Sequence, residues 1–228
     1  MQSIHRIYTK NKPAMKLAVM TNPYEVMFET DIINRLFREG LEELHLRKPA
    51  MSKIQLLNFI NAIDSSYHNR IVIHSFYGLA KKFQLGGIQL DSSFRKNWLL
   101  NWIVNKVILR GIAIKKYSTI HSYKSLYHTL KGVDEVLIGP VFRKVSDHIC
   151  NPMIKRDSLQ KAISHSQVKV TGIGSVCLET ISDFKAMGFD GVIVQSAIWK
   201  SSDPVQAYVA LRDFELNALP MMKVVGKE

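Results

Sequence analysis

The stretch VKVTGIGS at residues 168–175 and the stretch GVIVQSAI at residues 191–198 decide the fold of this chain. Each begins with a short run rich in valine or isoleucine, which is typical of a β-strand, and ends in small residues. A helical pattern from about Val176 to Met187 lies between them. Two successive strand ends that open into helices can aim backbone N–H groups at one anion. The loops after strands seven and eight of a (β/α)₈ barrel often hold a phosphate in this way.

Six earlier strand–helix units precede this pair at a regular spacing. Short strands rich in Val, Ile and Leu are typical of a parallel sheet buried on both faces, and we predict them near Lys16–Met20, Glu42–Arg47, Arg70–His74, Gly87–Leu90, Gly111–Lys115 and Glu135–Gly139. Helical patterns are predicted near Glu25–Glu39, Ser52–Tyr67, Phe76–Phe83, Ser92–Asn105, Ser122–Leu130, Arg156–Ser164 and Pro204–Phe214. This alternation predicts an α/β fold, a single (β/α)₈ TIM barrel, with a doubly wound sheet as the alternative.

The composition is that of one soluble globular domain, since 46% of the 228 residues are hydrophobic and 22% are charged. No apolar run reaches the roughly 18 residues of a membrane span. Residues 16–228 are predicted to form the barrel. Residues 1–15 are polar and basic, without a secretory signal, and form either a flexible N-terminal extension or a segment upstream of a true start at Met15. Cys150 and Cys177 lack metal-type spacing, so a reducing cytoplasmic setting is expected.

The formal net charge of +12 raises the question of a nucleic-acid partner. The basic residues are scattered, however, with no run of five and no RNA-binding motif or zinc finger. A basic surface also steers small phosphorylated ligands. We therefore predict a small phosphorylated ligand, and neither a nucleic acid nor a membrane, as the partner.

The second predicted strand carries the first candidate site residues. Side chains alternate along a strand, so His45 and Arg47 share one face, which points into the proposed barrel near its carboxyl end. An inward arginine is expected where it meets an anion, and its planar fork suits a phosphate, a diphosphate or a carboxylate. The alternative is a structural salt bridge between Arg47 and a neighbour such as Glu43.

Two more histidines follow predicted strand ends, at His74 and His121. With His45 they give three imidazoles that can move protons near neutral pH, so any of them is a candidate proton-transfer residue. Three histidines can also bind zinc, and each can equally fill a structural role.

Asp91 follows the fourth strand, where a carboxylate either binds Mg²⁺ or caps the next helix. Gly139 ends the sixth strand and begins a long segment, reaching about Lys155, that we interpret as a mobile lid loop. Arg143 and Lys144 in that loop either contact an anionic substrate or remain in solvent.

Seven ordered pieces of the sequence resemble the superfamily of thiamine phosphate synthases and TenI-like thiazole tautomerases, over about Lys16 to Ala207. The pieces are Leu17–Thr21, Leu46–Lys48, Gly86–Leu90, Thr119–Ser122, Ile138–Phe142, Gly172–Val176 and Gly191–Ile198. The resemblance implies a (β/α)₈ barrel. It also implies thiamin biosynthesis, with a thiazole phosphate as ligand.

The diphosphate half of the family site is altered in this chain. Synthases join hydroxymethylpyrimidine diphosphate to a thiazole phosphate, release pyrophosphate, and use Mg²⁺ with an Arg-x-Lys motif. Arg47 matches this motif, but Pro49 stands in place of its lysine. His74-Ser75 replaces the family's Asn-Asp pair, and Asp91 is out of register with its second aspartate. The segment at 143–146 also departs from the family's Thr-x-Thr-Lys.

The thiazole-phosphate half is better kept. The resemblance assigns the phosphate to Gly174 and Ser175 in one turn and to Gln195 and Ser196 in the next. A kept phosphate site with an eroded metal site is similar to the tautomerase branch. Pro140, however, stands where that branch commonly has a catalytic histidine.

Three hypotheses follow. The pattern favours the first, a TenI-like tautomerase without a certain cofactor, in which Ser175 and Ser196 fix the phosphate. Arg47 then holds a carboxylate, and one of the three histidines moves the proton. The second is a synthase whose rebuilt diphosphate site uses Arg47, Lys48, Arg143 and Asp91 with Mg²⁺, near Gly139. The third is a non-catalytic protein that binds the thiazole phosphate. A homodimer is expected in each case.

Overall fold

The computed structural model describes residues 14–90, 102–104, 110–128, 131–146 and 149–217. Parallel strands form a closed barrel in the order β1-β10-β9-β6-β5-β4-β3-β2. Their bounds are β1 Lys16–Met20, β2 Leu44–Leu46, β3 Ile71–Ile73, β4 Gly87–Leu90, β5 Lys115–Ile120, β6 Glu135–Ile138, β9 Lys169–Ile173 and β10 Gly191–Val194. The predicted (β/α)₈ barrel is confirmed, and the doubly wound alternative is wrong.

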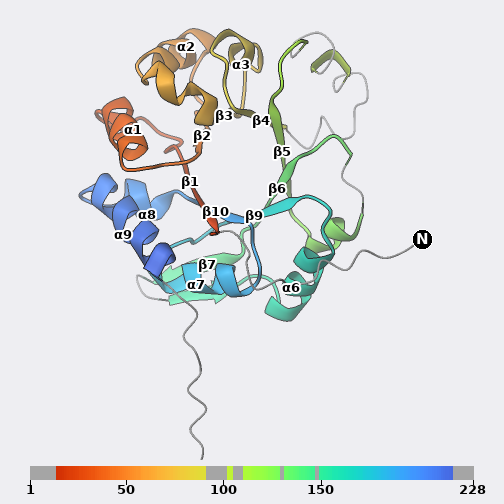
Figure 1. Cartoon of the computed structure of the whole chain (residues 1–228). Coiled ribbons are helices and arrows are strands. Elements are labelled where there is room, and N and C mark those ends of the chain that lie inside the picture. The colour runs from red at the N-terminus through yellow and green to blue at the C-terminus, as the bar shows by residue number, and fades with distance from the viewer. Residues whose placement is uncertain (1–13, 91–101, 105–109, 129–130, 147–148, 218–228) are drawn as a thin grey trace, which may run out of the picture.

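Helices surround this ring of strands (Figure 1). They are α1 Glu29–Arg38, α2 Lys53–Asn61, α3 Gly78–Lys82, α6 Arg156–His165, α7 Leu178–Ala186, α8 Ser196–Trp199 and α9 Pro204–Asn217, with 3₁₀ helices η1 Ser65–Arg70 and η3 Tyr123–Tyr127. Among the described residues, no helix has the length and apolar character needed to cross a bilayer.

Local sequence signals explain where several helices begin. The Ser52 hydroxyl accepts the backbone N–H of Gln55, whose side chain accepts the N–H of Ser52 in return, so α2 starts with a capping box. The Asp203 carboxylate accepts the N–H groups of Val205 and Gln206 at the start of α9, where Pro204 has no N–H to satisfy.

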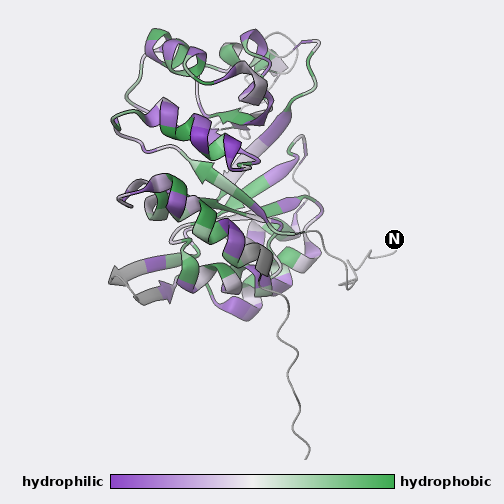
Figure 2. Ribbon diagram, turned by 60° about the vertical axis from the view of Figure 1, so that its left-hand side comes forward, coloured by the Kyte–Doolittle hydropathy of each residue, from purple (hydrophilic) through white to green (hydrophobic). Residues whose placement is uncertain are grey.

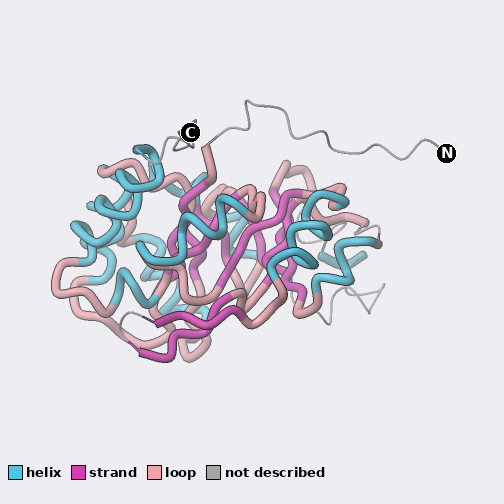
Figure 3. Tube along the Cα trace, turned by 90° about the horizontal axis from the view of Figure 1, so that it is seen from below, coloured by secondary structure: helices cyan, strands magenta, loops and turns pink. Residues whose placement is uncertain are grey.

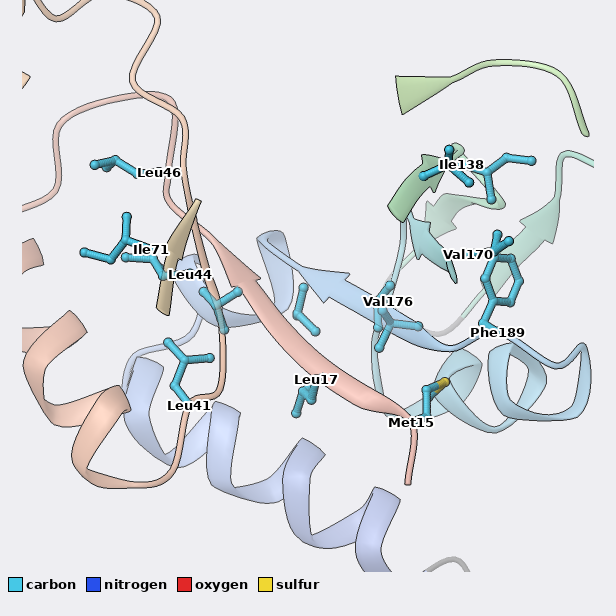
Figure 4. Packing of buried hydrophobic residues seen from close by; sticks show 14 of the residues in the cluster. Met15, Leu17, Leu41, Leu44, Leu46, Ile71, Ile138, Val170, Val176 and Phe189 are labelled. Carbon is cyan, nitrogen blue, oxygen red and sulfur yellow. The ribbon is translucent and has the colours of Figure 1, made fainter. Parts of the chain in front are cut away.

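The main hydrophobic core lies between the strands and the surrounding helices. Leu17 and Leu44 point outward from β1 and β2 into this layer, as Figure 4 shows, and both are buried. The apolar strands therefore lie inside a shell whose helices carry the polar residues (Figure 2). Packing is tight where β9 meets α7, because a Cβ on Gly172 would lie 2.4 Å from Phe184 Cε1.

A smaller apolar cluster fills the inside of the barrel. Ala18, Val72, Tyr117, Leu137 and Ile193 point inward from five strands and pack together. Polar side chains that also point inward from the barrel strands extend this inner cluster, and they form the site described below.

Several predicted elements differ from the observed ones. The fifth strand was placed at Gly111–Lys115, but it runs from Lys115 to Ile120. The apolar residues around Ile112 misled the prediction, since Gly111 has a φ of 82° that suits a turn and not a strand. The predicted helix Ser122–Leu130 is the short 3₁₀ helix η3, and Ser52–Tyr67 divides into α2 and η1. Most of the predicted helix Ser92–Asn105 lies outside the described residues.

The structure of the segment after β6 also differs from the predicted one. The predicted lid loop Gly139–Lys155 contains an antiparallel hairpin, β7 Phe142–Ser146 and β8 Ile149–Pro152. Figure 3 shows this hairpin outside the ring of barrel strands. Its backbone hydrogen bonds hold the segment as a two-stranded ribbon.

Candidate active site at the carboxyl end of the barrel

A cavity of about 380 Å³ opens where strands β2 to β5 end. Four neighbouring strands supply its walls, as expected for the loop face of such a barrel. The described lining residues are Arg47, Lys48, Pro49, His74, Ser75, Gln89, Leu90, Thr119 and His121. The structure thus brings together Arg47, His74 and His121, which were predicted from separate parts of the sequence.

His45 lies beneath this cavity. Its side chain is fully buried, with Nδ1 3.1 Å from Nε2 of His74 and Nε2 3.1 Å from Oε1 of Glu43. The prediction that His45 points into the barrel is therefore confirmed. It is not among the described residues that line the cavity, and its contact with His74 connects it to the cavity wall.

A buried network of charged side chains extends below His45. The Lys16 ammonium donates to Glu43 at 2.7 Å and to Glu135 at 2.8 Å, and the Tyr117 hydroxyl donates to Glu43 at 2.5 Å. The Thr171 hydroxyl donates to Glu135. Sequence analysis missed this network, although strand alternation places Lys16 and Glu135 on inward faces. Charged residues at positions that strand alternation turns inward could have indicated a buried ion pair.

These contacts fix the charge of the network at neutral pH. Burial alone would raise the pKa of Glu43, but its hydrogen bonds and electrostatic interactions with His45 and Lys16 hold it well below its usual range. Burial lowers the pKa of Lys16, but Glu43 and Glu135 outweigh this and raise it. Burial and the charge of Glu43 raise the pKa of the Tyr117 hydroxyl. The network therefore holds two opposite charges on Glu43 and Lys16 next to a neutral Tyr117.

The surroundings of His74 favour its neutral form, whereas those of Glu43 favour its charged form. Burial lowers the pKa of His74 well below its ordinary value of 6.5, and its electrostatic interactions with His45 and Arg47 lower it further. His74 is consequently neutral at pH 7 in the free protein. A neutral imidazole at the edge of the cavity can either accept or donate a proton.

Acid is expected to destabilise the native protein through His74. Because its pKa is lower in the folded than in the unfolded state, the unfolded state binds more protons as pH falls below 6.5. The free energy of unfolding should then decrease by up to about 1.4 kcal/mol per pH unit until the folded-state pKa is reached. Urea unfolding between about pH 5 and 7.5 measures this slope.

The change in the free energy of unfolding per pH unit should be smaller in the His74→Gln variant. It should be unchanged in His128→Gln, which alters an exposed histidine after η3. Equal slopes in the His74→Gln variant and the unmodified protein would contradict the lowered pKa.

Arg47 is exposed at the cavity wall. The structural alternative, a salt bridge with Glu43, is wrong, because Glu43 is held by Lys16, His45 and Tyr117. Within the described ranges no carboxylate forms an ion pair with Arg47. Its guanidinium is therefore available to an anion that enters the cavity.

Lys48 has a different position from the one expected of a substrate ligand. Its ammonium is buried in an ion pair with Glu29 of α1, and it donates to the Tyr24 carbonyl at 2.7 Å. Lys48 lines the cavity, but its charge is used to tie α1 to the end of β2. This is a correction to its prediction as a cation for the diphosphate.

The described residues do not fit a metal site. Mg²⁺ prefers carboxylate and other oxygen ligands, and the described cavity wall offers imidazoles, an amide, hydroxyls and a guanidinium. No group of three His, Cys, Asp or Glu side chains in the described part of the chain is placed to hold a metal ion. The zinc alternative for the three histidines therefore has no structural support there, and Asp91 lies outside the described residues.

The two predicted phosphate turns meet at a second cavity, of about 340 Å³, whose wall includes Ser175 and Ser196. Gly174 and Ser175 have φ values of 95° and 47°, which make the tight turn before α7. The Gln195 side chain donates to the Thr21 carbonyl at 3.1 Å, so it joins β10 to β1. Gly174 and Gln195 are not among the described residues of this wall. The turns lie across the barrel from β2–β4 (Figure 1).

Gly139 and Arg143 are not among the described residues that line either cavity. A Cβ on Gly139 would lie 2.2 Å from the Ile173 carbonyl oxygen, so a glycine is required there for β6 and β9 to pack. Arg143 is exposed on the β7–β8 hairpin. Their predicted contacts with substrate have no support in this geometry.

Comparison with known proteins finds relatives of similar sequence and fold. No family model matches the chain. It is 24% identical over 178 residues to the thiamine-phosphate synthase of Leuconostoc citreum, covering 75% of this chain and 82% of the relative. It is 26% identical over 197 residues to that of Proteus mirabilis, covering 82% and 87%.

Solved structures agree with the sequence relatives. A thiamine phosphate pyrophosphorylase from Bacteroides thetaiotaomicron superposes with a TM-score of 0.70 at 25% identity, over 88% of this chain and 97% of that one. A second, from Pyrococcus furiosus, gives 0.72 at 17% identity, over 89% and 96%. With the barrel and the ordered strand-end motifs, these similarities support the resemblance of the chain to the superfamily of thiamine phosphate synthases and TenI-like proteins.

Proposed function

We propose that this protein is a transferase of the thiamine phosphate synthase type. It would join hydroxymethylpyrimidine diphosphate to a thiazole phosphate and release pyrophosphate. The observation that carries the proposal is a pair of polar regions that follow strand ends at the carboxyl edge of the barrel, one with Arg47 and the histidines and one with Ser175 and Ser196. The names of the relatives support the synthase over the tautomerase.

The first region suits the diphosphate end of the pyrimidine substrate. In the reaction, the bond between the pyrimidine methylene carbon and the diphosphate oxygen breaks, and a carbon–nitrogen bond to the thiazole forms. The leaving diphosphate gains negative charge, so donors placed around it stabilise the transition state. Arg47 offers a bidentate fork, while Ser75, Thr119 and His121 offer further polar groups on the same wall.

The second region suits the phosphate of the thiazole. The turn at Gly174 and Ser175 leads into the first turn of α7, and Ser196 begins α8. Backbone N–H groups at such turns bind phosphate oxygens without a dedicated cation. Two separated anion sites are what a reaction between two phosphorylated substrates requires.

A second candidate function is proton transfer on a thiazole carboxylate phosphate, as in TenI-like tautomerases. The specific observation in its favour is a neutral His74 on the cavity wall, in contact with His45. Arg47 would then hold the substrate carboxylate. This reaction needs no metal, which agrees with the donor set of the described cavity residues.

The test is a direct assay of both reactions with the full chain. The protein is incubated with both synthase substrates, with and without MgCl₂, and thiamine phosphate and pyrophosphate are measured. We expect the two products in equal amounts, with no pyrophosphate released when the thiazole phosphate is left out. Isomerisation of the thiazole carboxylate phosphate without thiamine phosphate would replace the synthase by the tautomerase. Binding without turnover would make the protein a non-catalytic ligand-binding member.

We further propose a homodimer located in the cytoplasm. Light scattering coupled to size-exclusion chromatography measures the mass of the particle, and a monomer at micromolar concentration would overturn the dimer.

A further inference from the structure

A continuous chain of side-chain hydrogen bonds leads from the cavity into the barrel. His74, on the cavity wall, contacts His45 through Nε2, and His45 contacts Glu43 through its own Nε2. Glu43 also accepts from Lys16 and Tyr117, and Lys16 reaches Glu135. One end of this chain lies on the cavity wall, and the other end holds charged groups in the largely buried interior of the barrel.

The charge of Glu43 determines how protons are arranged along the chain. An ionised carboxylate accepts hydrogen bonds and cannot donate them, so His45 carries a proton on Nε2. One further proton lies between His45 Nδ1 and His74 Nε2, because two unprotonated nitrogens would not form the 3.1 Å contact. The remaining ring nitrogen of His74, Nδ1, is then left to a ligand in the cavity.

The groups around the two imidazoles set the class of that ligand. Arg47 and His121 share the cavity wall with His74, and Lys48 is neutralised there by Glu29. Below the cavity, His45 packs edge-on against the ring of Tyr117, and the Tyr117 hydroxyl donates a hydrogen bond to Glu43. No carboxylate is found among the described residues of the wall. An oxyanion is therefore the ligand that the described wall favours.

We propose that this cavity binds a diphosphate together with one proton, which is stored on the His45–His74 pair and balanced by Glu43. The proton enters from solvent at His74 Nδ1, and the proton on His74 Nε2 passes to His45 Nδ1. His74 is again neutral and donates from Nδ1 to the anion. His45 becomes an imidazolium beside Glu43, 3.1 Å away.

The proposal rests on the proposed function for its choice of diphosphate as the anion. It also accounts for the donor set of the described wall, which does not fit Mg²⁺. A proton taken up with the ligand supplies the positive charge that a carboxylate-held cation would otherwise bring. The negative ligand favours protonation of the pair, and Arg47 opposes it while the cavity is empty.

Calorimetric titration with inorganic pyrophosphate in the presence of EDTA tests this coupling. Titrations in two buffers of different ionisation enthalpy give the number of protons taken up per ligand bound. Because pyrophosphate itself titrates near neutral pH, the readout is the difference in proton number between the unmodified protein and each variant. We expect His45→Gln and His74→Gln each to lower the number by about 0.5 or more at the pH of maximal uptake.

The linked proton also makes affinity depend on pH. For one proton, Kd should rise by up to tenfold per pH unit as pH increases, and this slope should flatten in both variants. His128→Gln is the matched control, since it makes the same change on an exposed histidine that is not among the described residues of the cavity wall. It should leave the proton number and the slope unchanged.

Proton numbers that are the same in all four proteins would overturn the proposal. So would ¹⁵N spectra of the unmodified protein in which the ring nitrogens of His45 keep their shifts on pyrophosphate binding, a measurement that does not depend on the variants folding. Proton-coupled binding without thiamine phosphate formation would instead remove the proposed function and leave this site intact. Thiamine phosphate formation with no linked proton would do the reverse.

Discussion

Replacing Arg47 with alanine is expected to lower kcat/KM for thiamine phosphate formation by about 100- to 1,000-fold. The exposed guanidinium lies on the cavity wall with His74 and His121, and within the described ranges no carboxylate is paired with it. Its removal would leave the leaving diphosphate without a bidentate partner. Steady-state kinetics with both substrates measures the loss.

Two further variants show whether the fork itself matters. Arg47→Lys keeps a positive charge but cannot form two parallel hydrogen bonds, so it should retain only part of the activity. Arg35→Ala removes an exposed arginine from α1, on the outside of the barrel, and should leave kcat/KM unchanged. Activity of Arg47→Ala within a few-fold of the unmodified protein would show that the diphosphate binds elsewhere.

Strand alternation predicted the inward face of β2 correctly but not the depth of each residue. Glu43, His45 and Arg47 lie on one face, as expected. Their depth depends on how neighbouring strands are staggered. His45 pairs in register with Val72 of β3. His74 follows Val72 by two residues, just after β3 ends, so it lies nearer the barrel mouth than His45 does. That offset places His74 in the cavity and His45 below it, and a single strand carries no information about it.

The sequence also did not indicate which residues far apart in the chain form ion pairs. Lys48 is predicted from the sequence as one of the residues that bind the diphosphate. Its partner, Glu29, is 19 positions earlier and was expected only as part of a helix. Glu135 lies 119 positions from Lys16, and closure of the barrel brings them together. Composition and periodicity thus predict rows and faces, while ion pairs inside a barrel require the order and stagger of the strands.

Replacing Glu43 with leucine is expected to lower the free energy of unfolding at pH 7 by about 3–5 kcal/mol. The buried carboxylate accepts hydrogen bonds from Lys16, His45 and Tyr117. Leucine would leave the Tyr117 hydroxyl and the His45 N–H without an acceptor in the barrel interior, where unpaired polar groups are costly. Reversible urea unfolding measures the change, with the unmodified protein as reference.

Glu43→Gln should cost less, about 1–3 kcal/mol, because the amide oxygen still accepts a hydrogen bond while Lys16 keeps its ion pair with Glu135. Glu42→Leu changes the exposed neighbour and should stay within about 0.5 kcal/mol of the unmodified protein. The loss of unfolding free energy should thus be largest in Glu43→Leu, smaller in Glu43→Gln and smallest in the Glu42→Leu control. The difference between the two Glu43 variants separates loss of the hydrogen-bond acceptor from loss of the charge. If Glu43→Leu were as stable as the control, the desolvation of the carboxylate would equal the benefit of its contacts. The network would then be kept for the protonation of His45 and not for the stability of the barrel.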